Sequence, residues 1–208
     1  MRIGNHFLLI IVLIISLLSS CRENGKINST SSNEKDSLAM EEFIEEITNK
    51  NVQKTFYSTS LGDSKSDVIR NFAMHDLVLV PQMSTTNSSF FVNPKSRFIN
   101  FGGMNWEAVQ ASFNSNDIFT GVSFSVNYSN KDLAMQELEI RYEILKQKYK
   151  IIHLPKDSVF SIKTYRICGK DSGALLYCDE HEGLDHNIWY GLFLTYALNN
   201  DGNVSDEL

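Results

Sequence analysis

The residues best suited to chemistry lie near position 180, where soft and hard metal ligands follow one another. The segment Cys178–Glu182 is followed within a few positions by Asp185 and His186. Thiolate, imidazole and carboxylate groups are the usual ligands of zinc and related divalent metals. This composition makes His181, His186 and Glu182 the candidate metal ligands of the chain.

The spacing within this segment argues against a single metal site. If the segment is a strand, Cys178, Glu180 and Glu182 project to one side and Asp179 and His181 to the other. One metal ion could not reach both groups. The alternative interpretation, which the spacing favours, is an acidic, solvated turn between two strands.

Sequence motifs for other reactions are missing from the chain. It contains no Gly-x-Ser-x-Gly, no His-Glu-x-x-His and no glycine-rich phosphate loop, which are the arrangements that serine hydrolases, zinc proteases and nucleotide-binding enzymes require. Gly102-Gly103 is expected to form a tight turn between strands. The sequence therefore predicts no catalytic residues and no cofactor.

The beginning of the chain carries a targeting pattern. A basic start precedes an apolar run from Phe7 to Leu18, which is shorter than the roughly 20 apolar residues of a membrane-spanning helix. Leu18-Ser19-Ser20-Cys21 resembles the lipobox of bacterial lipoproteins, in which leucine and two small residues precede the lipidated cysteine. The resemblance implies removal of residues 1–20 as a signal peptide and acylation of Cys21, including a palmitate-type chain.

This lipobox resemblance also implies a location. Several acyl chains on Cys21 would hold the protein permanently on a membrane, which becomes its first partner. In lipoproteins an acidic residue after the cysteine favours retention in the inner membrane, whereas this chain has Arg22. We therefore expect an anchor in the outer membrane, with the protein facing the periplasm.

An oxidising envelope makes Cys168 and Cys178 candidates for a disulfide. Whether the two cysteines can form this bond depends on the turn between them. A three-residue loop centred on Gly173 would set the two cysteines opposite each other, whereas a two-residue Ser172-Gly173 turn would oppose Cys168 to Tyr177. Both geometries remain open from the sequence.

Composition and charge limit the class of protein. The chain has 208 residues, 42% of them hydrophobic, and 19 basic against 25 acidic residues. Residues 21–36 are polar and predict a flexible tether, residues 37–200 are long enough for one domain with its own core, and residues 201–208 form a tail. The acidic balance disfavours binding to nucleic acid.

Hydrophobic periodicity predicts three helices. The first covers residues 37–48, the second begins at the capping residue Ser64 and ends near His75, and the third covers residues 131–150.

Strands are expected in the remaining apolar runs. Within 119–126, Val122, Phe124 and Val126 alternate with serines, which is typical of a sheet with one buried face. The predicted strands are residues 77–80, 89–92, 97–101, 106–113, 119–126, 159–168, 174–178 and 188–198.

The expected fold is α+β, a mostly antiparallel sheet packed against two or three helices. The segment Leu61–Val68 resembles the Gly-x-Ser/Thr-x-x-Glu/Asp-Val start of the first helix in small outer-membrane assembly lipoproteins and in the β-lactamase inhibitory proteins. That resemblance implies binding to other proteins through a sheet or loop surface, with no catalytic residues. This chain differs from those families in placing a long helix between two groups of strands.

Aromatic residues supply a candidate binding surface. Alternation along a strand sends neighbouring rings to opposite faces, so rings remain available for a ligand unless both faces are covered. The candidates are Phe90, Trp106, Trp189 and Tyr190. We expect a membrane-anchored envelope lipoprotein that acts as a protein-interaction or structural module; the alternatives are an envelope hydrolase or metal-dependent enzyme, and a glycan or small-ligand binder.

Overall fold

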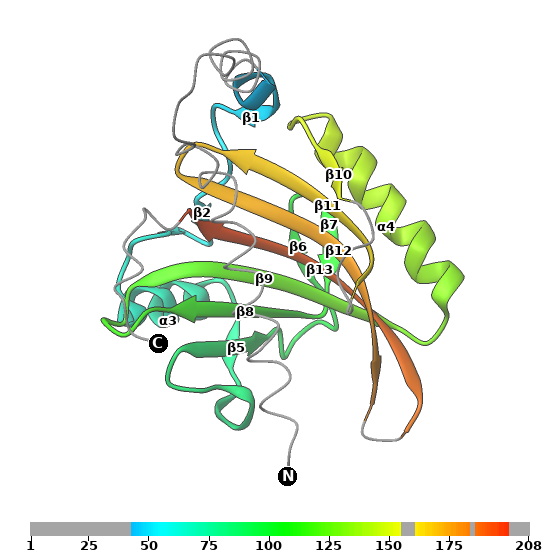
Figure 1. Ribbon diagram of the computed structural model, residues 1–208. Helices are drawn as coiled ribbons and strands as arrows, with labels where there is room; N and C mark the ends of the chain where they lie inside the picture. Colours follow the sequence, from blue (N-terminus) through cyan, green and yellow to red (C-terminus); the bar gives the residue numbers. More distant parts are fainter. Residues whose placement is uncertain (1–42, 155–160, 184–185, 200–208) are drawn as a thin grey trace, which may run out of the picture.

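The computed structural model describes residues 43–154, 161–183 and 186–199, which are organised around one large, twisted sheet (Figure 1). The strand order across the sheet is β1-β11-β12-β13-β9-β8-β5-β4, with β10 paired to β11. In that order the strands are β1 Thr48–Asn49, β11 Ser161–Gly169, β12 Ser172–Glu182, β13 Ile188–Leu198, β9 Phe119–Tyr128, β8 Ala108–Phe113, β5 Ser88–Val92, β4 Val78–Leu79 and the added β10 Ile152–Leu154.

The sheet is mixed rather than purely antiparallel. Strand β1 pairs in parallel with β11, matching Thr48 with Cys168, while the remaining neighbours pair antiparallel. The chain also forms helices α3 and α4, so the broad α+β class is confirmed. The alternation predicted for β9 is confirmed as well, because Val122, Phe124 and Val126 are buried.

Helix α3, Lys65–Met74, begins where its capping residue predicts. The Ser64 side chain accepts a hydrogen bond from the Asp67 backbone at 3.2 Å and donates one to the Asp67 carboxylate at 2.6 Å. Val68 and Phe72 are buried on the inner side of the helix. The helix ends at Met74 with His75 as its C-cap, as expected.

Helix α4, Lys131–Lys146, is capped by Asn130 and ends four residues earlier than its periodicity predicts. The reason lies in Asn49. Its side-chain oxygen accepts from the Lys150 backbone at 2.7 Å, and its amide donates to the carbonyl oxygens of Lys150 and Cys168 at 3.0 and 2.9 Å. These bonds draw the chain after α4 toward β1 and out of the helical path.

Two small hairpins and a short 3-10 helix complete the described part. The hairpins are β2 Thr55–Phe56 with β3 Thr59–Ser60, and β6 Ile99–Phe101 with β7 Met104–Trp106; the 3-10 helix η2 is Pro81–Met83. Gly102 and Gly103, both with positive φ, form the predicted tight turn between β6 and β7.

Three predicted boundaries are wrong. The strand expected over 106–113 breaks at Glu107, which separates β7 from β8, because Trp106 turns into the core while Ala108 lies on the other side of the sheet. Strand β12 extends to Glu182, so the expected turn at 178–182 is strand and the hairpin reverses after it. Residues 43–47 are helical, but Thr48 begins β1 instead of ending that helix. The predicted signal peptide, tether and tail lie outside the described residues.

Candidate functional site

The two faces of the sheet are built differently. On one face, Leu176 of β12, Leu192 of β13 and Phe124 of β9 join the main core together with residues of both helices, such as Phe72 of α3 and Leu138 of α4. We call this the helix face. Figure 1 shows α4 along one side of the sheet and α3 behind β8 and β9.

The opposite side, called the second face here, carries its own apolar cluster. Leu175 and Tyr177 of β12 and Phe193 and Ala197 of β13 are buried and contact one another. The rings of Tyr177 and Phe193 stack with centroids 4.9 Å apart and planes 16° from parallel. Among the described residues outside the cluster, Leu154 of β10 is the apolar side chain that packs against it.

Short and polar side chains continue the second face across β9 and β8. Ser125 lies directly opposite Phe193, and Ser123 lies opposite Thr195, to which it is hydrogen-bonded at 2.9 Å. Gln110 follows on β8 opposite Ser123. The second face is therefore apolar on β12 and β13 and polar on β8 and β9.

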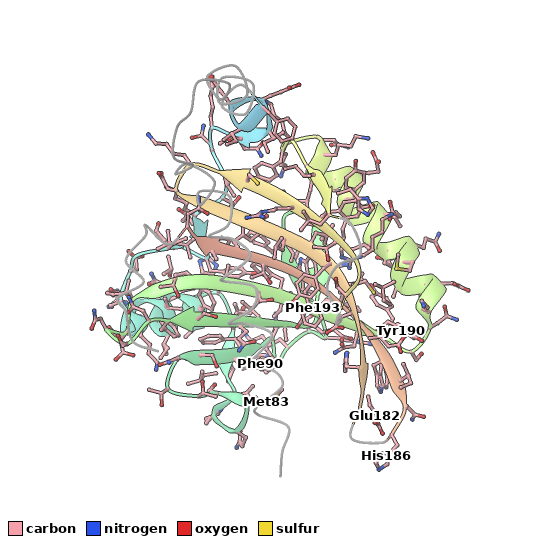
Figure 2. The ribbon with its side chains drawn as sticks, viewed as in Figure 1. Met83, Phe90, Glu182, His186, Tyr190 and Phe193 are labelled. Carbon is pink, nitrogen blue, oxygen red and sulfur yellow. The ribbon has the colours of Figure 1, made fainter. Side chains whose placement is uncertain are left out.

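The four predicted binding aromatics separate in the structure. Phe90, half-buried on β5, lies opposite Gln110 and so belongs to the second face (Figure 2). Trp189 alternates with Tyr190 on β13 and falls on the side of Phe193, whereas Tyr190 packs against the main core.

Trp106 is not a binding residue, because it is fully buried on the helix face. Its indole N–H donates to the Phe101 carbonyl at 3.3 Å, and the Arg141 guanidinium lies 4.9 Å from its ring centroid. The break in the strand at Glu107 turns the indole inward.

Two of the three candidate metal ligands meet, and the third lies apart from them. The Nδ1 of His186 lies 2.7 Å from a carboxylate oxygen of Glu182, at the exposed end of the β12–β13 hairpin (Figure 2). His181 lies within β12 opposite Trp189, and burial lowers its pKa. Among the described residues no group of three histidine, cysteine, aspartate or glutamate side chains could hold a metal ion.

Asp179 is a buried carboxylate on the second face. Burial raises its pKa to about 6, and the nearby charge of Glu180 adds to that effect. Tyr177, on the same face of β12, has its pKa raised by burial and by Asp179. The environment thus favours the neutral forms of both groups near pH 5.

The structure does not pair Cys168 with Cys178. The β11–β12 hairpin turns at Lys170-Asp171, earlier than either turn considered above, and this register sets Cys178 opposite Lys163. Cys168 lies five positions further along β11, a separation of roughly 16 Å along the strand. A disulfide requires Cα atoms within about 7 Å, so the bond that the sequence left open does not form between these two cysteines. Burial raises the pKa of the Cys178 thiol to about 12.

The periodicity of α4 did not predict that Arg141 would be buried. Its guanidinium pairs with Glu137 and donates to the Asn105 carbonyl at 3.1 Å and to the Tyr128 hydroxyl at 3.4 Å. A second polar cluster joins α4 to β11, where Lys163 and Tyr165 both bind the Glu139 carboxylate, at 2.6 and 2.9 Å. Both clusters hold α4 on the sheet.

Comparison with known proteins yields no relative: no family model, curated protein or solved structure matches the chain. In the part of the chain that the structure describes, no helix has the length and apolar character needed to cross a membrane.

Proposed function

We propose that this chain is a lipid-anchored protein of the bacterial cell envelope whose second face binds another protein. The proposed location follows from the lipobox-like segment Leu18–Cys21 and the polar segment after it. Acylated Cys21 would anchor the domain in the outer membrane, on its periplasmic side. The resemblance of Leu61–Val68 to protein-binding envelope families agrees with an interaction role.

One observation carries the binding proposal: β12 and β13 carry apolar side chains on the second face as well, while the described helices pack on the helix face. We describe the fold accordingly as a mostly antiparallel sheet with its helices gathered on one side. An apolar sheet face is stable when another layer covers it. Leu175, Tyr177, Phe193 and Ala197 are already buried within this chain, each at 9% exposure or less. We therefore assign to a partner protein the half-buried positions around them, Ser125, Thr195 and Phe90. The competing assignment is the remainder of this same chain.

Photo-crosslinking in cells distinguishes these assignments. A photoreactive amino acid would be placed at Ser125 or Thr195, the polar positions beside Phe193 on the second face. The matched control position is Ile140, which is exposed on α4. We expect adducts with another envelope protein from the two second-face positions and none from Ile140.

Two results would contradict the proposal. Adducts confined to peptides of the same chain would show that the protein covers its own second face. Equal intermolecular adducts from Ile140 would show that the second face is not distinguished from the rest of the surface. A Cys21→Ser chain tests the proposed lipid anchor separately. Loss of the lipid should release the protein from membrane fractions, whereas the crosslinked adducts report on the second face.

A glycan is the second candidate ligand, favoured by the half-buried rings of Phe90 and Trp189 on the second face. Sugar rings stack on aromatic faces, and Ser125 and Gln110 could hydrogen-bond hydroxyl groups. Titration with envelope glycan fragments, followed by the fluorescence of Trp189, tests this candidate. Saturable binding that Phe90→Leu weakens would favour the glycan over the protein partner.

A further inference from the structure

Five lysines gather at one end of the domain, around a shallow open hollow. They are Lys50, Lys146, Lys148, Lys150 and Lys170, and all five are exposed. They come from three separate segments: the residue after β1, the end of α4 with the residues following it, and the β11–β12 turn. We call this set the lysine surface.

The lysine surface stands out against an acidic chain. The protein has 25 acidic residues against 19 basic ones, yet the acidic residues lining this hollow are Glu45 and Glu46. Positive charge is therefore concentrated locally, against the net charge of the molecule.

Much of this charge is available to a ligand. Lys146 lies 3.5 Å from Glu143, and the Lys150 ammonium donates to the backbone carbonyl of Glu46 at 2.5 Å. Within the described residues, Lys50, Lys148 and Lys170 form no ion pair. An anionic surface could bind these three without first displacing a carboxylate.

Exposed apolar side chains lie at the same end. Phe43 is 54% exposed and Ile44, which lines the hollow, is 38% exposed. Lysines beside exposed aromatic and aliphatic residues are typical of protein surfaces that rest in the headgroup region of a membrane.

The position of these residues along the chain also supports contact with the membrane. Phe43 follows the proposed lipidation site Cys21 by 22 residues. The predicted tether over residues 21–36 would have a typical end-to-end distance of roughly 22 Å if it is a flexible chain. The lysine surface therefore belongs to the part of the domain that the anchor keeps nearest the membrane.

We propose that the lysine surface binds the anionic, phosphate-bearing headgroups of the membrane in which the protein is anchored. This proposal rests on the proposed lipid anchor, which would bring the lysine surface to the membrane, but headgroup binding itself is a property of the folded domain. Each lysine near an anionic bilayer strengthens binding roughly fivefold. Removing three of them should weaken binding by a factor of roughly 100, since the factors multiply.

The test is cosedimentation of the mature-length chain, residues 21–208 with Cys21→Ser, with lipid vesicles. Vesicles of phosphatidylglycerol and phosphatidylcholine are compared with vesicles of phosphatidylcholine alone. The variant combines Lys50→Gln, Lys148→Gln and Lys170→Gln. We expect binding to the anionic vesicles that weakens with added salt and is lost in the variant.

A control variant makes the same change in net charge elsewhere. It combines Arg70→Gln, Lys95→Gln and Lys131→Gln, three exposed positions outside the hollow, and should bind almost as well as the unsubstituted chain. Equal losses in both variants would mean that net charge alone governs binding and would overturn the proposal, as would equal binding to both kinds of vesicle. Circular dichroism verifies that both variants fold.

Failure of this experiment would leave the proposed function standing. Membrane release of the full-length Cys21→Ser chain reports on the anchor, and crosslinking at Thr195 reports on the second face. Neither measurement depends on the three lysines.

Discussion

Arg141 offers the sharpest test of how the helix face is held together. Its side chain is 5% exposed and reaches from α4 to β7 and β9. We predict that Arg141→Ala destabilises the domain severely, although the residue lies in the middle of a helix where alanine is the best helix former. The loss must therefore come from tertiary contacts.

The contacts of Arg141 determine how much free energy of unfolding the Arg141→Ala variant should lose. Alanine would leave the Asn105 carbonyl and the Tyr128 hydroxyl without their donor. Because Asn105 is exposed and Tyr128 is half-buried, each loss costs about 1–2 kcal/mol. It would also remove the cation from the ring of Trp106, which contributes about 1–2 kcal/mol when desolvated. Glu137 is 31% exposed and regains water, so it adds little. The buried Nε of Arg141 has no partner, which offsets part of the loss. We expect a net destabilisation of about 3–5 kcal/mol.

Urea unfolding of the mature-length Cys21→Ser chain measures this loss. Arg141→Lys should cost less than Arg141→Ala, because lysine keeps the charge and most of the volume but loses the forked geometry. Arg97→Ala is the matched control: Arg97 pairs with Glu107 but is 73% exposed, so its loss should cost less than about 1 kcal/mol. If Arg141→Ala were no more destabilising than Arg97→Ala, the reasoning about buried contacts would be refuted.

Three further predictions concern single groups. In urea unfolding experiments, Ser64→Ala should lower the free energy of unfolding by about 1 kcal/mol. Ser64→Asn should restore most of that loss, because the side-chain oxygen of either serine or asparagine can cap α3. Burial raises the pKa of Asp179 to about 6, so between about pH 4 and 6 the native state keeps a proton that the unfolded chain has released. The free energy of unfolding should therefore fall as pH rises through this range. Asp179→Asn should remove that fall and stabilise the protein by about 1–2 kcal/mol at pH 7.5, measured by urea unfolding across the pH range. Because its pKa is raised to about 12, the Cys178 thiol should react with iodoacetamide at pH 8 at the rate of unfolding, and rapid reaction in the native state would contradict its burial.

Local signals in the sequence predict the elements that are organised locally. Ser64 and Asp67 mark the start of α3 within one residue, and the alternation of Val122, Phe124 and Val126 identifies β9 and its buried side. Each signal lies within a few residues of the structure it determines. The distribution of strands around α4 follows from the same kind of pattern.

Features that depend on distant residues could not be predicted in this way. Strand β1 contains two residues and is held by Asn49, whose partners Lys150 and Cys168 lie more than 100 positions away. Burial of Arg141 depends on Asn105 and Tyr128, which an isolated helix pattern does not contain.

The candidate site was predicted only in outline for the same reason. Alternation indicated that one of each aromatic pair would face away from the core, but it could not show that Trp106 turns inward at Glu107. The stacking of Tyr177 on Phe193 depends on the register between β12 and β13. Similarly, the register of the β11–β12 hairpin separates the two cysteines, and a turn shifted by a few residues would have changed that outcome.

The charges of the domain lead to a final prediction about its orientation. The lysine surface includes Lys170, at one end of β12, while Glu180 and Glu182 lie toward the other end beside His186. Strand β12 runs from Ser172 to Glu182, which spans roughly 33 Å. An anionic bilayer would attract the lysine end and repel the acidic end, so the domain should stand with the β12–β13 hairpin directed away from the membrane.

Fluorescence quenching can test this orientation in the lipidated protein. Single labels would be attached through Gln147→Cys, beside the lysines, or His186→Cys, at the hairpin; the natural cysteines Cys168 and Cys178 are buried. A nitroxide-bearing lipid should quench the label at position 147 strongly and the label at position 186 weakly, and added salt should reduce the difference, because screening weakens the attraction between lysines and headgroups. Equal quenching at both positions in low salt would mean that the anchored domain tumbles freely and that the lysine surface does not orient it.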